Sequence, residues 1–185
     1  MAISLIPDQL CDSIYELDGE ALQKAGIRLI LADLDNTISP YSVSEPTEDV
    51  REWHAMLMSY GLSLFIVSNN RSKTRIKHYC SLLDVPFIDH AGKPRRAPFF
   101  QAMKQMGVTP KETIMVGDQV FTDVLGAKNA GIKVILVEPI ELRDNLFRRL
   151  RHFLEQPIIA IARHRQSRTA KGQRDSQGDL ESRGL

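Results

Sequence analysis

Two aspartates directly follow a short apolar segment near the start of the chain. Residues 29–32 read Leu-Ile-Leu-Ala, and a continuous apolar run of this length predicts a strand buried on both faces. Asp33 and Asp35 come next, at the end of a strand, where open α/β sheets bind their ligands. Burying two neighbouring carboxylates is costly unless a cation pairs with them. The pair therefore predicts a site for a divalent metal ion.

Further polar side chains follow the other segments that we expect to be strands. Ser68 and Asn69 come after the second such segment, Lys93 after the third and Asp118 after the fourth, with Asp123 five residues later. All should lie along one edge of the sheet. Such groups suit phosphoryl transfer: one carboxylate attacks phosphorus, another moves a proton, and a hydroxyl and an ammonium hold the phosphoryl oxygens. Carboxylate oxygens also suit Mg²⁺.

Strands and helices alternate in the elements that must position these groups. Apolar segments predict strands at residues 29–32, 62–67, 85–88, 113–116 and 133–137, with helices at 47–60, 71–83, 98–106 and 121–130 between them. A further helix is predicted to begin near Pro7, because Leu10, Ile14 and Leu17 recur at helical spacing. The alternation favours an α/β fold, a doubly wound, Rossmann-like three-layer sandwich around a parallel sheet of about five strands.

Four short motifs, in this order, resemble those of the haloacid dehalogenase (HAD)-like hydrolase superfamily. They are Asp-Leu-Asp-Asn-Thr at 33–37, Ser-Asn-Asn at 68–70, Lys-Pro at 93–94 and Gly-Asp-Gln-Val-Phe-Thr-Asp at 117–123. The resemblance covers about residues 28–139 and implies a phosphatase that works through an aspartyl-phosphate. By this resemblance Asp33 would be the nucleophile and Asp35 the acid and base. Ser68, Asn69 and Lys93 would bind phosphate.

The resemblance also implies a Mg²⁺ site. The ligands would be the carboxylates of Asp33 and Asp118 and the backbone carbonyl of Asp35. Thr37 would support these ligands, and Asp123 would support the metal or Lys93 without binding the metal directly. In detail the motifs look closest to the IIIA-type phosphatases, the YqeG-like group. That group is related to the phosphatidylglycerophosphate phosphatases, so the resemblance implies phosphatidylglycerophosphate as a candidate substrate.

The gaps between the motifs leave no room for a cap domain. About 30 residues separate Thr37 from Ser68 and about 24 separate Ser68 from Lys93, and predicted elements already fill both gaps. A capless HAD core has an open site, which suits a phosphate presented on a lipid surface, a protein or a nucleic acid. Arg95 and Arg96, just after Lys93, are predicted to bind a second anionic group of the substrate.

Composition and charge indicate one domain with appended segments. We expect a helical lead-in at 1–27, the catalytic core at 28–140, a basic amphipathic helical segment at 141–166 and a disordered tail at 167–185. The net charge of +1 gives no specific nucleic-acid signal. Two isolated cysteines, no secretory pattern and no long apolar run predict a cytoplasmic protein. Residues 142–165 either pack on the domain or contact an anionic membrane surface.

The same residues leave other interpretations open. Strand-end carboxylates such as Asp118 and Asp123 also occur as acids in the first turn of a helix, Ser68 as a helix cap, and Lys93 as a solvated loop residue. A rival function is a phosphorylatable switch, which holds a phospho-aspartate without hydrolysing it. Asp35 argues against a switch, because only a hydrolase needs a second carboxylate there. Nucleotide, nucleic-acid end and phosphoprotein phosphatases remain enzymatic alternatives.

Overall fold

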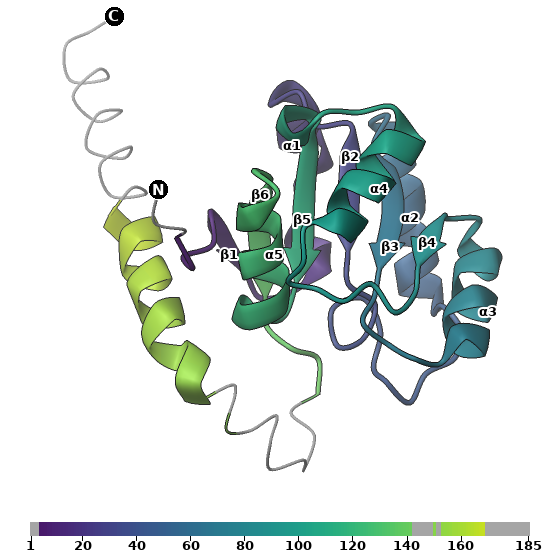
Figure 1. Ribbon diagram of the computed structural model, residues 1–185. Coiled ribbons are helices and arrows are strands. Elements are labelled where there is room, and N and C mark those ends of the chain that lie inside the picture. The colour runs from purple at the N-terminus through teal and green to yellow at the C-terminus, as the bar shows by residue number, and fades with distance from the viewer. Residues whose placement is uncertain (1–3, 142–149, 151–152, 169–185) are drawn as a thin grey trace, which may run out of the picture.

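A parallel six-stranded sheet forms the centre of the molecule (Figure 1). The computed structural model describes residues 4–141, 150 and 153–168, and within these the strand order is β1-β6-β5-β2-β3-β4. Every neighbouring pair is parallel. The strands are β1 (Gln9–Cys11), β2 (Leu29–Ala32), β3 (Ser63–Val67), β4 (Phe87–Ile88), β5 (Thr113–Gly117) and β6 (Lys133–Val137). The α/β, Rossmann-like fold and all five predicted strands are confirmed.

Helices cover both faces of this sheet, which makes the predicted three-layer sandwich (Figure 1). On one face lie α1 (Gly19–Lys24), α2 (Glu48–Ser59) and α3 (Lys73–Leu83), and on the other lie α4 (Ala97–Met106) and α5 (Leu125–Asn129). Successive strand residues point to opposite faces. In β2, Ile30 and Ala32 join the first core, while Leu29 and Leu31 join the second. Burial on both sides explains why the strand sequences are apolar throughout.

Local signals in the sequence determine where several helices begin and end. Thr47 caps α2, its hydroxyl accepting a hydrogen bond from the backbone N–H of Val50 at 3.4 Å. Gly107 ends α4 in a left-handed conformation, with φ of 65°. A capping box between Thr109 and Glu112 spans the short helix η2 (Pro110–Glu112) before β5. From the first motif to the third the structure contains only loops, α2 with β3, and α3 with β4, so the core is capless.

The N-terminal segment differs from its prediction. The helix expected from Pro7 is absent, and β1 pairs there with β6 as a sixth strand, followed by η1 (Ile14–Glu16) and α1. Asp8 anchors this pairing: its backbone N–H donates to the Val134 carbonyl at 2.9 Å, and its carboxylate accepts from the Val134 N–H at 2.7 Å. A strand of three residues is too short to show a periodic pattern, and the free edge of β6 decides its conformation.

Residues 153–168 form a helix that lies beside β1 (Figure 1). Ile159 packs into the second core, and the Gln166 side chain bonds to the Leu10 N–H at 2.8 Å and to its carbonyl at 3.1 Å. The helix ends at residue 168, two residues past the predicted end at 166, so residues 167–168 are helical and not part of a disordered tail. The predicted tail from 169 onward and residues 142–149 and 151–152 lie outside the described residues. None of the described helices is long and apolar enough to cross a membrane.

The unexpected edge strand gives a stability prediction. Asp8→Ala removes the acceptor of the buried Val134 N–H and the partner of Lys128, which is 2.7 Å away. We expect the free energy of unfolding to fall by about 1–2 kcal/mol, measured by urea denaturation. Asp12→Ala, which removes an exposed carboxylate just past β1, is the control and should change stability by less than about 0.5 kcal/mol. Equal losses in both variants would contradict the anchoring role.

Candidate active site

The carboxyl ends of β2 and β3 open into a polar cleft of about 400 Å³. Predicted site residues line it together with loop residues that follow these strands. The lining comprises Asp33, Asp35, Tyr41, Ser68, Asn69, Asn70, Arg71, Ser72, Lys93, Gln119 and Thr122. The sheet thus brings together five of the predicted site residues, as the strand-end positions of their motifs require.

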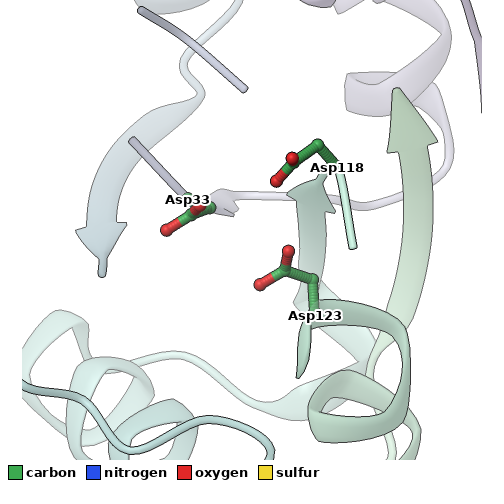
Figure 2. Close-up of side chains that lie close together, drawn as sticks. All are labelled: Asp33, Asp118 and Asp123. Carbon is green, nitrogen blue, oxygen red and sulfur yellow. The ribbon is translucent and has the colours of Figure 1, made fainter. Parts of the chain in front are cut away.

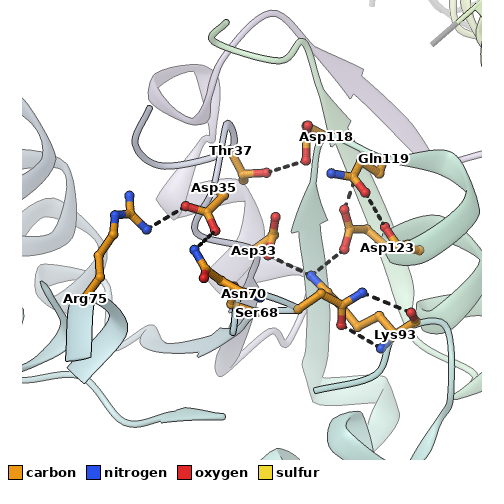
Figure 3. A network of polar contacts seen from close by, with 12 residues as sticks. Asp33, Asp35, Thr37, Ser68, Asn70, Arg75, Lys93, Asp118, Gln119 and Asp123 are labelled. Carbon is orange, nitrogen blue, oxygen red and sulfur yellow. Dashed lines mark hydrogen bonds and ion pairs between the residues drawn. The ribbon is translucent and has the colours of Figure 1, made fainter. Parts of the chain in front are cut away.

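A buried ammonium group joins two carboxylates at the bottom of the cleft (Figure 3). Lys93 Nζ lies 2.9 Å from Asp33 Oδ1 and 2.6 Å from Asp123 Oδ1, and the three side chains are between 0% and 7% exposed. Burial alone lowers the pKa of Lys93, but the charges of Asp123 and Asp33 outweigh it, so the pKa is raised above its ordinary value. Lys93 therefore stays cationic and keeps a positive charge beside the predicted nucleophile.

The loop that carries Lys93 is held by Asn69. The Asn69 amide donates to the Lys93 carbonyl at 3.0 Å and accepts from the Lys93 N–H at 2.8 Å. The Asn69 side chain thus fixes the backbone of Lys93, and its own contact with phosphate stays a prediction. Ser68 is buried beside it, and its hydroxyl accepts a hydrogen bond from the Asn70 N–H at 3.1 Å.

A wide helical turn brings Asp123 into the cluster. The π-helical turn η3 (Val120–Val124) follows β5, and the Asp123 carboxylate accepts from the Gln119 N–H at 3.2 Å. A side chain at Gly117 would place its Cβ 2.5 Å from Asp123, so this approach requires glycine. Burial raises the pKa of Asp123; Lys93 opposes the shift and Asp33 adds to it. Asp123 thus lies beside Lys93, 2.6 Å from its ammonium group, in keeping with its predicted supporting role.

Three carboxylates could hold a metal ion (Figure 2). Asp33, Asp118 and Asp123 are all buried, and each offers an oxygen within 4.8 Å of the others. Thr37 donates a hydrogen bond to Asp118 Oδ1 at 3.2 Å and so orients it, in keeping with its predicted supporting role. A buried set of oxygen donors with net negative charge fits a hard divalent cation. The Asp35 side chain is not part of this cluster, and a role for its carbonyl stays a prediction.

Asp35 is held separately, on the opposite side of Asp33 (Figure 3). Arg75 Nη1 donates to one oxygen at 2.6 Å, and the Asn70 amide donates to the other at 2.7 Å. Burial raises the pKa of Asp35 and the charge of Asp33 adds to the rise, whereas Asn70 and Arg75 lower it. The net upward direction brings the pKa of Asp35 closer to the range in which a carboxyl group can both give and take a proton, as a general acid and base must.

The arginines of the site differ from those expected. Arg95 and Arg96 are exposed and are not among the residues that line the cleft, so their substrate role stays a prediction. Arg71 lines it instead. Arg75, which belongs to none of the four motifs, is only 12% exposed and contacts Asp35. Helical spacing contained the signal, because Arg75 lies four residues before the buried Tyr79 and shares its face.

Known proteins are similar to this chain in sequence and in fold. The family model described as HAD-hydrolase-like matches residues 90–139. The probable phosphatase YqeG of Bacillus subtilis is 31% identical over 160 residues, covering 86% of this chain and 92% of that protein. Phosphatidylglycerophosphate phosphatase 1 of Arabidopsis thaliana is 26% identical over 77% of this chain, which spans only 43% of that longer protein.

Solved structures show the same fold at lower identity. A structure of an uncharacterized protein from Listeria monocytogenes matches with a TM-score of 0.52 and 18% identity, over 65% of this chain and 84% of that one. A 3-deoxy-D-manno-octulosonate 8-phosphate phosphatase from Yersinia pestis matches with a TM-score of 0.50 and 17% identity, over 71% and 76%. With its sheet and ordered motifs, the chain belongs to the HAD-like hydrolase superfamily and is a phosphatase. Within the superfamily it belongs to the family of the probable phosphatase YqeG.

The cluster around Lys93 predicts a large and pH-dependent loss of stability. Lys93→Met leaves two buried carboxylates without their cation, which should lower the free energy of unfolding by about 3–5 kcal/mol. Lys93 opposes the upward shift that burial gives the pKa of Asp123, so without Lys93 the pKa of this carboxyl in the folded state rises further above that in the unfolded chain. Protonation then stabilises the fold, so the loss should be smaller near about pH 5 than near about pH 8.

Urea denaturation at both pH values measures this effect. Lys104→Met is the matched control, because Lys104 is an exposed cation on α4, and its loss should stay below about 0.5 kcal/mol. A Lys93→Met loss as small as that of the control, or one that grows as the pH falls, would contradict the charge balance described above.

Proposed function

We propose that this protein is a Mg²⁺-dependent phosphomonoesterase that works through an aspartyl-phosphate, an acyl phosphate formed on Asp33. One observation carries the proposal: Asp33 lies in the polar cleft, bonded at one oxygen to the buried cation Lys93 and next to two further acidic side chains. A carboxylate in this setting can approach phosphorus while a cation offsets the charge of the phosphoryl oxygens. The 31% sequence identity to the probable phosphatase YqeG supports the reaction class.

The reaction divides into two proton-balanced steps. An Asp33 oxygen attacks phosphorus, the bond between phosphorus and the leaving oxygen breaks, and Asp35 gives its proton to that oxygen. Asp35 then takes a proton from a water molecule, whose oxygen attacks phosphorus and breaks the bond to Asp33. Inorganic phosphate leaves, and both carboxyl groups return to their first state. Lys93 and Ser68 hold the phosphoryl oxygens in both steps.

The acidic cluster supports the choice of Mg²⁺. Asp33 and Asp118, with Asp123 beside them, offer the hard oxygen ligands that Mg²⁺ prefers, and the open cleft leaves room for water and phosphate. When bound, Mg²⁺ would neutralise the negative charge that gathers between the substrate phosphate and the carboxylates. Thr37 orients Asp118 for this task through its hydrogen bond.

We further propose a phospholipid substrate, of which phosphatidylglycerophosphate is the first candidate. The relative in Arabidopsis thaliana, a phosphatidylglycerophosphate phosphatase, supports this class. A second pocket, of about 340 Å³, borders Asp118 and is lined in part by Leu136, Val137 and Ile159, which could receive apolar parts of a lipid. Exposed apolar side chains on the helix at 153–168, such as Phe153, support a cytoplasmic protein that touches the membrane surface peripherally.

Phosphate release by the purified protein tests reaction and substrate together. With Mg²⁺ present, wild type should hydrolyse p-nitrophenyl phosphate and, with higher kcat/KM, phosphatidylglycerophosphate in mixed micelles. Asp33→Asn, which cannot form the acyl phosphate, should lose at least about 10³-fold on both. Turnover of the small ester alone would remove the lipid proposal. A stable phosphate on Asp33 without turnover would indicate a switch instead of a hydrolase.

Metal binding can be tested without any substrate. Mg²⁺ at about a hundred times its dissociation constant should stabilise the fold by about 2.7 kcal/mol, a rise in Tm of about 5–10 °C. Asp118→Asn, which removes a ligand charge, should lose most of that rise, whereas Asp49→Asn, an exposed acid at the start of α2, should keep it. Equal shifts in both variants would place the metal elsewhere.

A further inference from the structure

Arg75 of α3 connects three parts of the molecule through its guanidinium group. Nη1 donates to Asp35 Oδ1 at 2.6 Å; Nε and Nη2 donate to the Val43 carbonyl at 3.1 and 2.8 Å; and Nη2 also donates to the Pro40 carbonyl at 3.0 Å. The group lies over the Tyr41 ring, 5.4 Å from its centroid. One side chain thus joins α3, the loop at 38–46 and the carboxylate after β2.

These contacts are too specific for a solvated surface arginine. The Arg75 and Asp35 side chains are only 12% and 15% exposed, and a charge pair this far removed from water persists only with good geometry and further hydrogen bonds. The planar guanidinium holds five donors in a fixed fork, whereas the lysine ammonium is a point charge with three donors on a flexible stem. The arrangement therefore requires arginine at this position.

The loop at 38–46 matters because it forms a wall of the cleft. Tyr41 lines the cleft beside Asp33 and Asp35, and two carbonyls on either side of Tyr41 accept from Arg75. Asp35 has both oxygens held, one by Arg75 and the other by Asn70 (Figure 3). Arg75 therefore determines at the same time where the cleft wall stands and where the Asp35 carboxyl group points.

We propose that Arg75 is a positioning residue for proton transfer by Asp35, and that it couples this transfer to the wall of the cleft. The inference rests on the proposed function, in which Asp35 protonates the leaving oxygen. Arg75 does not touch the reacting atoms. It keeps the Asp35 carboxyl group within reach of the leaving oxygen, where a misplacement of about 1 Å can cost about 10²-fold in rate.

Leaving-group dependence distinguishes this role from a merely structural one. Phenyl phosphate has a poor leaving group that needs a proton, whereas 2,4-dinitrophenyl phosphate has a good one that does not. Arg75→Met should lower kcat/KM about 10²-fold on phenyl phosphate and less than about 5-fold on 2,4-dinitrophenyl phosphate. Arg75→Lys, which keeps the charge but not the set of bonds, should fall between wild type and Arg75→Met.

Two reference variants anchor the comparison. Asp35→Asn, like Arg75→Met, should lose more kcat/KM on phenyl phosphate than on 2,4-dinitrophenyl phosphate, because it removes the proton donor itself. Lys77→Met removes an exposed cation two residues further along α3 and should leave both rates within about 2-fold of wild type. The positioning role would be overturned if Arg75→Met lowered kcat/KM by the same factor on both esters, or did not lower it at all.

Hydrogen exchange measures the coupling to the loop without turnover. Arg75→Met should speed amide exchange in residues 38–46 by about 10-fold or more, and Lys77→Met should not. Unchanged exchange in Arg75→Met would overturn the coupling. The Asp33→Asn variant distinguishes a failure of the proposed function from a failure of the Arg75 role. If wild type is no more active than Asp33→Asn, the proposed function fails and the role of Arg75 fails with it. If only the leaving-group pattern is missing, the positioning role alone fails.

Discussion

The ion pairs of Lys93 with Asp33 and Asp123 are the interaction on which the rest of the site depends. The three side chains are almost fully buried, and an unpaired charge at such a buried position would cost several kcal/mol. Each comes from a different part of the chain, so the ammonium joins the end of β2, the loop after β4 and the turn after β5. The same cation that permits burial of the carboxylates also offsets the charge of a phosphate bound beside Asp33.

The backbone around the cluster is shaped so that Lys93, Asp33 and Asp123 can meet. The π-helical turn after β5 and the missing side chain at Gly117 let Asp123 approach, and Asn69 fixes the backbone of Lys93 from both sides. These features carry no charge. They set the distances between groups that do, and this is how a rigid sheet edge becomes a site for phosphoryl transfer.

Sequence reasoning succeeded where one physical rule links pattern to place. Parallel strands buried on both faces are continuously apolar, and their carboxyl ends meet at one edge, so the positions of Asp33, Ser68 and Asp118 followed from counting along the chain. Reasoning failed for β1, where three residues take their conformation from the edge of β6. The motifs also leave out Arg75, a charged residue that shares the helix face of the buried Tyr79 and contacts Asp35.

The sequence by itself thus determined the α/β fold, the ordered motifs and the acidic and basic groups available for phosphoryl transfer, because these depend on local apolar runs and on strand order. Only the tertiary structure decided which partner each charge takes. Asp123 joins Lys93 and the carboxylate cluster, and Asp35 is held by Arg75. Such pairings depend on distances between segments far apart in the chain, and no spacing along the sequence encodes them.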